Sequence, residues 1–299
     1  RSSLAQRLGV TLEQPYPSSD RSEGLANIML DALNDVKQPL TVERLMQWHR
    51  WLFNDPDWTM QRLRIGQLRG SEPMQVVSGR LDYPKVHFEA PPREGLEERL
   101  NAFIAWFNQS LNDSLLDPLL RAGITHLWFV TLHPFDDGNG RITRTLTDLS
   151  LAQMDEQSIR LYAMSTAILN KRKSYYEILE QTQKNDSDIT DWLVWFLDTL
   201  NDSLEKTLAQ ISRTLFKSQF WHKYSNLALS EEQRKVLNRL LDGGENGFEH
   251  GISASQYQKV AKTSKATATR HLSDLLEKKC IVKLEGGGRN TRYQINTQL

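Results

Sequence analysis

Apolar residues recur at spacings of three and four along most of the chain, which is the period of an amphipathic helix. The pattern predicts helices at residues 25–36, 41–53, 95–111, 119–133 and 189–211. Residues 69–92 break this pattern, because they contain β-branched pairs, Gly79 and several prolines. Such a composition favours a short β-hairpin or an ordered loop. The chain is therefore predicted to be mainly α-helical, with one short β element in its first half.

The end of the chain carries a different pattern. Residues 252–264 and 265–280 read as two short helices separated by a turn, and residues 281–295 read as strand, glycine turn and strand. The second helix is predicted to turn three leucines inward: Leu272, Leu275 and Leu276. From Ile252 to Leu299, nine Lys/Arg stand against three Asp/Glu, whereas the whole chain has a formal charge of zero.

This helix–turn–helix and basic hairpin resembles a winged helix-turn-helix domain, with TATRHLSDLLEKK (267–279) typical of its recognition helix. The resemblance implies that a DNA groove is faced by Thr267, Thr269, Arg270 and His271, and that wing residues Arg289 and Arg292 reach phosphates. Winged helices also dock proteins, and a surplus of six charges is modest for a DNA binder. DNA and protein docking therefore both stay open.

Length and charge narrow the class of protein. A chain of 299 residues and 34.5 kDa suits about two domains. No apolar run is long enough to cross a bilayer, and RSSLAQRLGV (1–10) lacks the apolar core of a signal peptide. The single cysteine, Cys280, fits a reducing cytoplasm and is expected to be a buried structural thiol.

The run HPFDDGNGRITR (133–144) concentrates reactive side chains. Its residues 136–140 are predicted to form an irregular loop that feeds a helix, whose first amides and dipole favour an anion. Arg141 and Arg144 lie three apart, next to that anion site, and two guanidiniums suit a polyphosphate. Asp137 is the natural Mg²⁺ ligand and His133 the natural general base. Singly, each residue has an ordinary structural explanation; together they favour a polyphosphate site.

The same run matches, at every specified position, the signature of Fic-domain proteins, H-P-F-x-[D/E]-G-N-G-R-x-x-R. The resemblance covers about residues 19 to 200, and further stretches that carry it are MQWHRWLF (46–53), GQLRG (66–70), MQVVSG (74–79) and SYYEILEQTQKNDSDITDWLVWFL (174–197). It implies a helical Fic bundle with a β-hairpin flap, and the transfer of AMP from ATP to a Ser, Thr or Tyr hydroxyl of a target protein. The domains expected are an N-terminal segment (1–40), a Fic domain (41–215), and a helical linker with a winged helix (216–299).

The resemblance also implies roles for single residues. His133 deprotonates the target hydroxyl, Asp137 holds Mg²⁺ between the α- and β-phosphates, and Phe135 anchors the loop. The phosphates of ATP are bound by Gly138, Asn139, Gly140, Arg141 and Arg144, with Asn139 on the α-phosphate and Arg144 on the γ-phosphate. The flap residues Val76, Val77, Ser78 and Gly79 pair with a target segment by strand addition and cover the nucleotide, and Tyr175 lines its adenine or ribose side.

An inhibitory motif is implied as well. Ser19-x-x-x-Glu23-Gly24 resembles the [S/T]-x-x-x-E-[G/N] motif of many Fic proteins, and lies N-terminal to the signature. Glu23 is then expected to pair with Arg144 and occupy the γ-phosphate space. The same carboxylate could instead position a water that removes AMP from a target, and Fic proteins of this kind often form dimers.

Two other functions stay open. Fic-like kinases phosphorylate their targets but carry a lysine where this chain has Gly140. A transcriptional regulator could use the Fic core only to sense nucleotide, although such a sensor has no need of the base His133.

Overall fold

The computed structural model describes residues 20–53, 63–80, 83–154, 164–184, 188–243, 248, 250–285 and 291–298. They fall into two compact units, the first ending at Leu204 and the second running from Glu205 to Leu299. The sequence predicted this division after residue 215. The structure places it earlier, inside a long helix, α9 (Thr190–Lys223), that continues through both units.

The first unit is mainly helical, as predicted. Its other helices are α2 (Asp20–Asn34), α3 (Val42–Leu52), α4 (Leu96–Gln109), η2 (Ser110–Asn112), α5 (Pro118–Leu132), α6 (Asn139–Met154), α7 (Met164–Asn170) and α8 (Arg172–Lys184). The starts of several helices are fixed by side chains. Thr41 accepts a hydrogen bond from the amide of Arg44 at the start of α3, and Asp117 caps α5, where Pro118 takes the first helical position.

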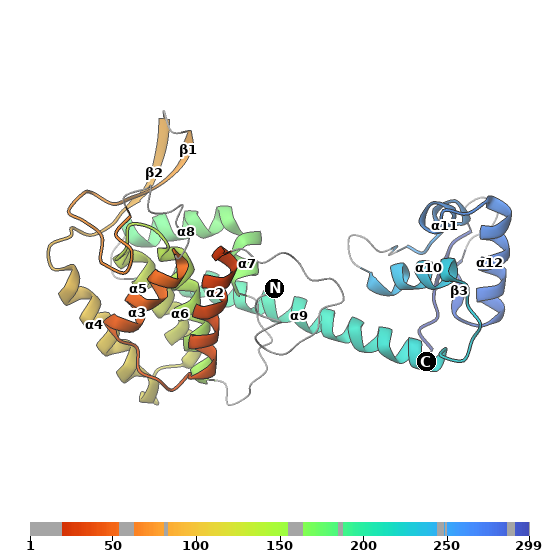
Figure 1. Cartoon of the computed structure of the whole chain (residues 1–299), viewed down its shortest axis with the longest axis horizontal. Coiled ribbons are helices and arrows are strands. Elements are labelled where there is room, and N and C mark those ends of the chain that lie inside the picture. The colour runs from red at the N-terminus through yellow and green to blue at the C-terminus, as the bar shows by residue number, and fades with distance from the viewer. Residues whose placement is uncertain are drawn as a thin grey trace. The chain divides into compact units, whose positions relative to one another are not determined.

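A hairpin projects from the helices of the first unit (Figure 1), as the composition of residues 69–92 predicted. It consists of β1 (Gln75–Arg80) and β2 (Tyr83–Glu89), which pair antiparallel with Gln75 opposite Glu89. The register shifts between Val76 and Val77, which is where a bulge bends the strand.

Helix α5 lies at the centre of the first unit because it is apolar on nearly all sides. Phe129 and Leu132 pack into one core cluster with α2, α3, α4 and α6, whereas Leu127 and Val130 pack into another with α7, α8 and α9. A helix held on both faces is a rigid support for whatever follows its C-terminal end. The residue that follows is His133.

The second unit follows the predicted order of helices and hairpin. It comprises the end of α9, α10 (Glu231–Asp242), α11 (Ala254–Ala261), α12 (Lys265–Glu277) and the antiparallel strands β3 (Ile281–Lys283) and β4 (Tyr293–Ile295). Capping boxes of Ser230 with Gln233 and Ser253 with Gln256 start α10 and α11. Helix α9 extends beyond its predicted end because Phe216 and Phe220 pack into this unit's core.

Two predictions about side chains of the second unit had different outcomes. Cys280 is fully buried, as expected, and Leu272 and Leu275 face the core. The inward orientation predicted for Leu276 is wrong, because it is 38 % exposed. The buried stripe of α12 runs through Ala268, Leu272 and Leu275, and the next residue along the helix is turned away from it. Among the helices described, none is both long enough and apolar enough to cross a membrane.

Candidate functional site

His133 caps the C-terminal end of α5 in the left-handed conformation, with φ 48° and ψ 55°. Its Nδ1 lies 3.2 Å from the carbonyl oxygen of Val130. Because a carbonyl only accepts, Nδ1 carries the proton and Nε2 keeps its lone pair. Burial lowers the pKa of His133, so the ring is neutral at pH 7. His133 is therefore held ready to accept a proton at Nε2.

The loop after His133 is closed by Asn139. Its side-chain oxygen accepts from the amide of Phe135 at 3.0 Å, and its side-chain nitrogen donates to the carbonyl of Phe135 at 2.7 Å. Phe135 is fully buried, as expected for the anchor of the loop. The oxygen and one N–H of the Asn139 side chain are thus used within the loop, whereas its second N–H has no partner among these bonds, and the α-phosphate contact expected from the sequence stays a prediction.

Helix α6 begins within this run. Its first residue is Asn139, so the prediction of irregular structure as far as Gly140 is wrong for the last two residues. The first helical hydrogen bond runs from the amide of Arg141 to the carbonyl of Gly138. The amides of Asn139 and Gly140 precede it and belong to the open first turn, where helices bind anions.

Gly138 meets two requirements of the loop at once. Its φ of 84° is one that side chains disfavour, and a Cβ there would lie 3.1 Å from both Leu52 and Phe53 at the end of α3. At Gly140 a Cβ would lie 3.3 Å from an Nη of Arg144. The two glycines therefore allow α3 and the Arg144 guanidinium to approach the loop closely.

A cavity lies beside this loop. Its wall consists of Val76, Phe88, Val130, His133, Gly140, Arg144, Tyr175, Tyr176, Leu179, Glu180 and Gln183. Arg144 forms no hydrogen bond or ion pair with the residues that the structure describes. The structure thus brings together, around one cavity, the predicted residues His133, Gly140, Arg144, Val76 and Tyr175, with a guanidinium available for an anion.

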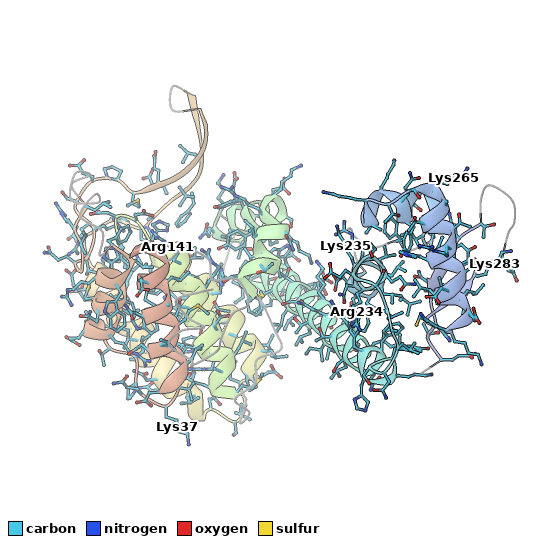
Figure 2. The ribbon with its side chains drawn as sticks, turned by 45° about the vertical axis from the view of Figure 1, so that its right-hand side comes forward. Lys37, Arg141, Arg234, Lys235, Lys265 and Lys283 are labelled. Carbon is cyan, nitrogen blue, oxygen red and sulfur yellow. The ribbon has the colours of Figure 1, made fainter. Side chains whose placement is uncertain are left out.

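Other predicted residues lie outside this cavity wall. Arg141, labelled in Figure 2, lies over the ring of Phe53 at 4.9 Å, with an Nη 3.4 Å from the Asp137 carboxylate. Arg141 and Arg144 therefore do not share one face of the cavity. The backbones of Val77, Ser78 and Gly79 form part of β1, but their side chains lie outside the described structure, as does the whole of Ser19.

Asp137 meets the requirements of a nucleotide-bound Mg²⁺ ion. Its side chain is 51 % exposed, beside the first turn of α6. No group of three or more metal-ligating side chains occurs in the described part of the chain. Mg²⁺ is held in many nucleotide sites by one or two carboxylates, with phosphates and water completing its shell. A single exposed carboxylate therefore fits Mg²⁺ that arrives with a polyphosphate.

Tyr175 is fixed in the cavity wall by a buried histidine that the sequence analysis missed. Thr147 donates its hydroxyl proton to the carbonyl of Thr143, so it accepts from Nδ1 of His126 at 2.9 Å. Nε2 of His126 then accepts from the Tyr175 hydroxyl at 3.0 Å. Burial lowers the pKa of His126 to about 3. This neutral imidazole links α5, α6 and α8 behind the cavity.

A second buried histidine, His49 of α3, supports the loop of residues 133–138, hereafter the catalytic loop. Its Nδ1 accepts from the amide of Gly66 at 2.9 Å, and its Nε2 donates to the carbonyl of Asp137 at 3.1 Å. The ring also stacks on Phe135 with centroids 4.3 Å apart. Burial lowers its pKa to about 4. In the sequence, the one indication of this role is that His49 interrupts an apolar helical pattern. A histidine at such a position is more often a core residue with its hydrogen bonds satisfied.

The predicted inhibitory helix is α2, where Glu23 is half-buried. It packs against α3 and against α6, the helix that carries Arg144. At Gly24, α2 and α3 are close together, since a Cβ there would lie 1.8 Å from the carbonyl oxygen of Trp51 in α3. Among the described residues no ion pair is seen between Glu23 and Arg144, so the pair expected from the sequence stays a prediction.

In the second unit, Thr269 and Arg270 are exposed and Thr267 is half-buried. Two predicted DNA contacts are used internally instead. Nδ1 of His271 lies 3.0 Å from the hydroxyl of Tyr257, so His271 faces α11. Arg292 donates to the carbonyl of Gly251 at 2.9 Å and ties β4 to the residues before α11. Arg289 lies outside the described residues.

Comparison with known proteins supports the prediction of a Fic domain. Residues 39–151 match the family model "Fic/DOC family". The chain is 33% identical over 96 residues to "Protein adenylyltransferase Fic" of Nematostella vectensis, which covers 32% of this chain and 21% of that protein. It is 30% identical over 117 residues to "Protein adenylyltransferase fic-1" of Caenorhabditis elegans, covering 39% of this chain and 20% of that protein. The chain thus spans about a fifth of the length of these relatives.

Two solved structures show a similar fold. A Fic family protein from Desulfovibrio desulfuricans aligns with a TM-score of 0.51 at 18% identity, over 98% of this chain and 80% of that chain. A Fic-domain signalling protein from Bacteroides thetaiotaomicron aligns with a TM-score of 0.50 at 20% identity, over 70% of this chain and 77% of that chain. The prediction of a Fic domain is confirmed: one lies at residues 39–151.

Proposed function

We propose that this chain, through its Fic domain, transfers AMP from ATP to a Ser, Thr or Tyr hydroxyl of a target protein. The observation that carries the proposal is the cavity that places His133 and Arg144 on one wall, with the β1–β2 hairpin beside them. The relatives named as protein adenylyltransferases support the same reaction. A proton acceptor and a cation on the wall of one pocket are what this transfer needs, because it depends mainly on positioning and charge neutralisation.

The chemical step uses the tautomer that the structure fixes. Nε2 of His133 takes the proton of the target hydroxyl while the hydroxyl oxygen forms a bond to the α-phosphorus of ATP. The bond from that phosphorus to the bridging oxygen of the β-phosphate breaks, and its electrons leave with pyrophosphate. The protonated imidazole then returns its proton to solvent. The products are AMP esterified to the target, and pyrophosphate.

The chain's own groups bind the triphosphate in this scheme. The amides of Asn139 and Gly140 in the first turn of α6 hold the α-phosphate, and Arg144 binds the γ-phosphate. The adenine and ribose of ATP lie against the part of the cavity wall formed by Tyr175, Tyr176 and Leu179, where apolar side chains stack on the adenine. Glu180 and Gln183, on the same wall, supply hydrogen-bonding groups at its edge. The hairpin is proposed to cover the nucleotide and to pair with a target segment through β1.

Asp137 is proposed to hold Mg²⁺ beside the α- and β-phosphates. When bound there, the ion would supply charge neutralisation for the departing pyrophosphate. Arg141 is beside Asp137, so we propose that it moves from the Phe53 ring to the β- and γ-phosphates when nucleotide binds.

Autoinhibition by Glu23 is part of the proposal. What supports it is that α2, which carries the half-buried Glu23, packs on α6, the helix that carries Arg144. A carboxylate that turns towards Arg144 competes with the γ-phosphate for the same guanidinium. We propose that the motif Ser19–Gly24 acts in this way. We also propose Glu23 as the residue that positions a water for removal of AMP from a target. The protein is further proposed to form a homodimer and to act in the cytoplasm.

The test uses ATP labelled at the α- or γ-phosphate with Mg²⁺ and a cell lysate as the source of targets. Wild type, Glu23→Gly and Glu23→Gly/His133→Ala are compared. Label from the α-phosphate alone, strongest in Glu23→Gly and absent from the double variant, is expected. Label from the γ-phosphate would identify a kinase instead, and equal labelling by wild type and Glu23→Gly would refute autoinhibition.

One observation favours a second candidate function, a DNA-binding transcriptional regulator that senses nucleotide. The exposed face of α12 carries the cations Lys265 and Arg270. It also carries two small residues, Thr269 and Ser273. Arg270 forms no hydrogen bond or ion pair with described residues. Figure 2 shows Lys265 near one end of α12 and Lys283 on the same unit. A helix with short side chains and free cations fits a major groove.

Binding of the full chain to duplex DNA tests this candidate directly. Affinity for a selected duplex is measured by fluorescence anisotropy at several salt concentrations for wild type, Arg270→Ala and Arg292→Ala. Arg270→Ala is expected to weaken specific binding and to flatten the salt dependence by about one ion. Absence of binding to any duplex at low salt would assign α12 to protein docking.

A further inference from the structure

We propose that Arg69 is a positioning residue for catalysis: its buried guanidinium holds His133 in the orientation and protonation state that the transfer needs. The inference rests on the proposed function only in taking His133 as the base. It concerns a residue outside the HPFDDGNGRITR signature, in the segment that precedes the hairpin.

The contacts of Arg69 converge on the catalytic loop. Its side chain is nearly fully buried, with 2 % exposed, and its Nε donates to the carbonyl of His133 at 2.9 Å. Its backbone amide donates to the carbonyl of Pro134 at 2.9 Å. One residue therefore binds the carbonyls of the two residues that follow α5, His133 and Pro134.

Arg69 is itself held from two further directions. Its Nη2 donates to the carbonyl of Pro91, just after β2, and its own carbonyl accepts from Nε of Arg93 at 2.8 Å. Arg93 is fixed in turn by paired contacts to the Glu97 carboxylate at 2.5 Å. The hydrogen bonds of Arg69 and Arg93, together called the clamp, thus join the segment before the hairpin, the segment after it, and the catalytic loop.

His133 needs such a clamp because of its backbone. With φ 48°, it occupies a conformation that residues other than glycine adopt rarely and at an energetic cost. That conformation turns the chain from α5 into the loop and sets the direction of the imidazole. In this conformation both carbonyls are in reach of Arg69, which binds each at 2.9 Å. These hydrogen bonds therefore favour the strained conformation over its alternatives.

The charge of Arg69 adds a second effect. No carboxylate pairs with it among the described residues, and its hydrogen bonds all go to backbone carbonyls. Burial and the neighbouring Arg93 and Arg99 lower its pKa, but an arginine stays protonated in proteins. The Asp136 carboxylate acts on Arg69 in the opposite direction, but no ion pair neutralises the guanidinium within the described residues, and a buried cation next to an imidazole disfavours a second positive charge. After burial, this cation is a further cause of the lowered pKa of His133.

Lysine could supply the charge but not the geometry. A guanidinium is planar and presents its donors in a fixed fork, whereas an ammonium is a point donor on a flexible stem. Two variants therefore separate the two effects. Arg69→Lys keeps the charge and loses the fork, and Arg69→Met loses both while keeping a long side chain.

The matched control is Arg121 of α5. It is also buried, with 3 % exposed, and it donates to Ser110 at 2.8 Å and to the carbonyl of Phe107 at 2.6 Å. It does not line the cavity or contact the catalytic loop. Arg121→Met therefore reports what loss of a buried arginine does to this fold in general.

All variants are made in full-length protein carrying Glu23→Gly, and kcat, the KM for ATP and the thermal midpoint are measured for each. Arg69→Met is expected to lower kcat about 10- to 100-fold with the KM for ATP changed less than about twofold, as for loss of a group that orients a catalytic residue. Arg69→Lys should recover part of kcat. An unchanged kcat in Arg69→Met, or a fall no larger than in Arg121→Met at equal loss of stability, would overturn the proposal.

A second readout is the titration of His133, followed by NMR of ring-labelled histidine without nucleotide. Arg69 and Asp137 are the charged groups that act on this ring, and Arg144 and Glu180 line the same cavity. The pKa of His133 is expected to rise in Arg69→Met and to stay unchanged in Arg69→Lys. An unchanged pKa in Arg69→Met would refute the electrostatic part.

The same readout keeps the two proposals apart. If the parent protein transfers no AMP to any target but the pKa of His133 rises in Arg69→Met, the proposed function fails and the link from Arg69 to His133 stands. If the parent is active and Arg69→Met retains full kcat, the proposed function stands and the positioning role fails.

Discussion

Replacing Gly24 with alanine should release the inhibitory helix without altering Glu23. In the present packing, a Cβ on Gly24 would lie 1.8 Å from the carbonyl oxygen of Trp51 and 2.8 Å from its carbonyl carbon. An ordinary carbon–oxygen contact is about 3.4 Å, so α2 must move away from α3 by about 1.6 Å. Both atoms of Trp51 belong to the backbone, and neither can rotate away as a side chain would.

The energy of this clash sets the size of the expected effect. Overpacking of one methyl group against fixed atoms costs about 1–3 kcal/mol. Alanine is a better helix former than glycine, but this gain applies whether α2 is docked or displaced, and does not restore docking. A loss of about 1–3 kcal/mol lowers the docked population relative to the displaced one by roughly 5- to 150-fold. AMP transfer by Gly24→Ala should therefore rise towards the level of Glu23→Gly.

The assay is labelling of a target with α-labelled ATP, alongside the thermal midpoint of each variant. Gly123→Ala is the matched control, because a Cβ there would lie 2.9 Å from Leu193 and 3.2 Å from Phe196, at the contact of α5 with α9. It should lower stability without raising transfer. The reasoning is refuted if Glu23→Gly raises transfer and Gly24→Ala does not, or if Gly123→Ala raises transfer as much as Gly24→Ala.

Three further predictions follow from the buried histidines and from Asp137. Tyr175→Phe removes the hydroxyl that His126 accepts but keeps the ring, so it should raise the KM for ATP severalfold with little change in kcat. In the double variant, His126→Phe should add little to the rise in KM caused by Tyr175→Phe. Additive effects on KM would contradict the link between His126 and Tyr175. Asp137→Asn should raise the Mg²⁺ concentration for half-maximal transfer about tenfold or more, and an unchanged Mg²⁺ titration would remove Asp137 as the ligand. His49 has a pKa of about 4 in the folded protein against an ordinary value near 6.5, so its neutral form stabilises the fold above pH 6.5. That stability is lost progressively as the pH falls to about 4, by up to about 3 kcal/mol, and urea unfolding at pH 7 and pH 4.5 measures the loss; equal stability at the two values would contradict a buried neutral ring.

The sequence predicted the elements of this fold well where one periodicity extends over a long stretch. The helices that contain residues 41–53 and 119–133 begin and end within a residue or two of their predicted limits, because apolar spacing and N-terminal caps act locally. The long α9 was underestimated. Its last turns are stabilised by Phe216 and Phe220 packing into the second unit, a tertiary contact that spacing alone does not reveal.

The candidate site could be predicted only as far as its chemistry is contiguous in the chain. The run HPFDDGNGRITR supplies the base, the first turn of a helix and the guanidinium of Arg144, and its order alone indicates a polyphosphate site. What the run does not show is which of its groups are already occupied. Asn139 has the right chemistry for a phosphate contact, but both ends of its amide bind Phe135, four residues back. Arg141 has the right charge and spacing, but it lies over the ring of Phe53 and is not part of the cavity wall.

The groups that hold the site come from distant parts of the chain, and their types give no warning of that role. His49 is 88 residues from the Asp137 carbonyl it binds, and Arg69 is 64 residues from His133. A histidine in an apolar helix or an arginine before a hairpin is usually a satisfied core group or a solvated cation. These two are distinguished only by burial together with backbone carbonyls of the catalytic loop as partners. We therefore expect that the run HPFDDGNGRITR grafted into a helical scaffold without His49 and Arg69 would be inactive. The graft should still offer a helix N-terminus that binds anions. His133, however, would lack the contacts that hold it at φ 48° and the neighbouring cation that helps to keep it neutral. Chemistry in this protein is encoded locally, whereas its orientation is encoded by the fold.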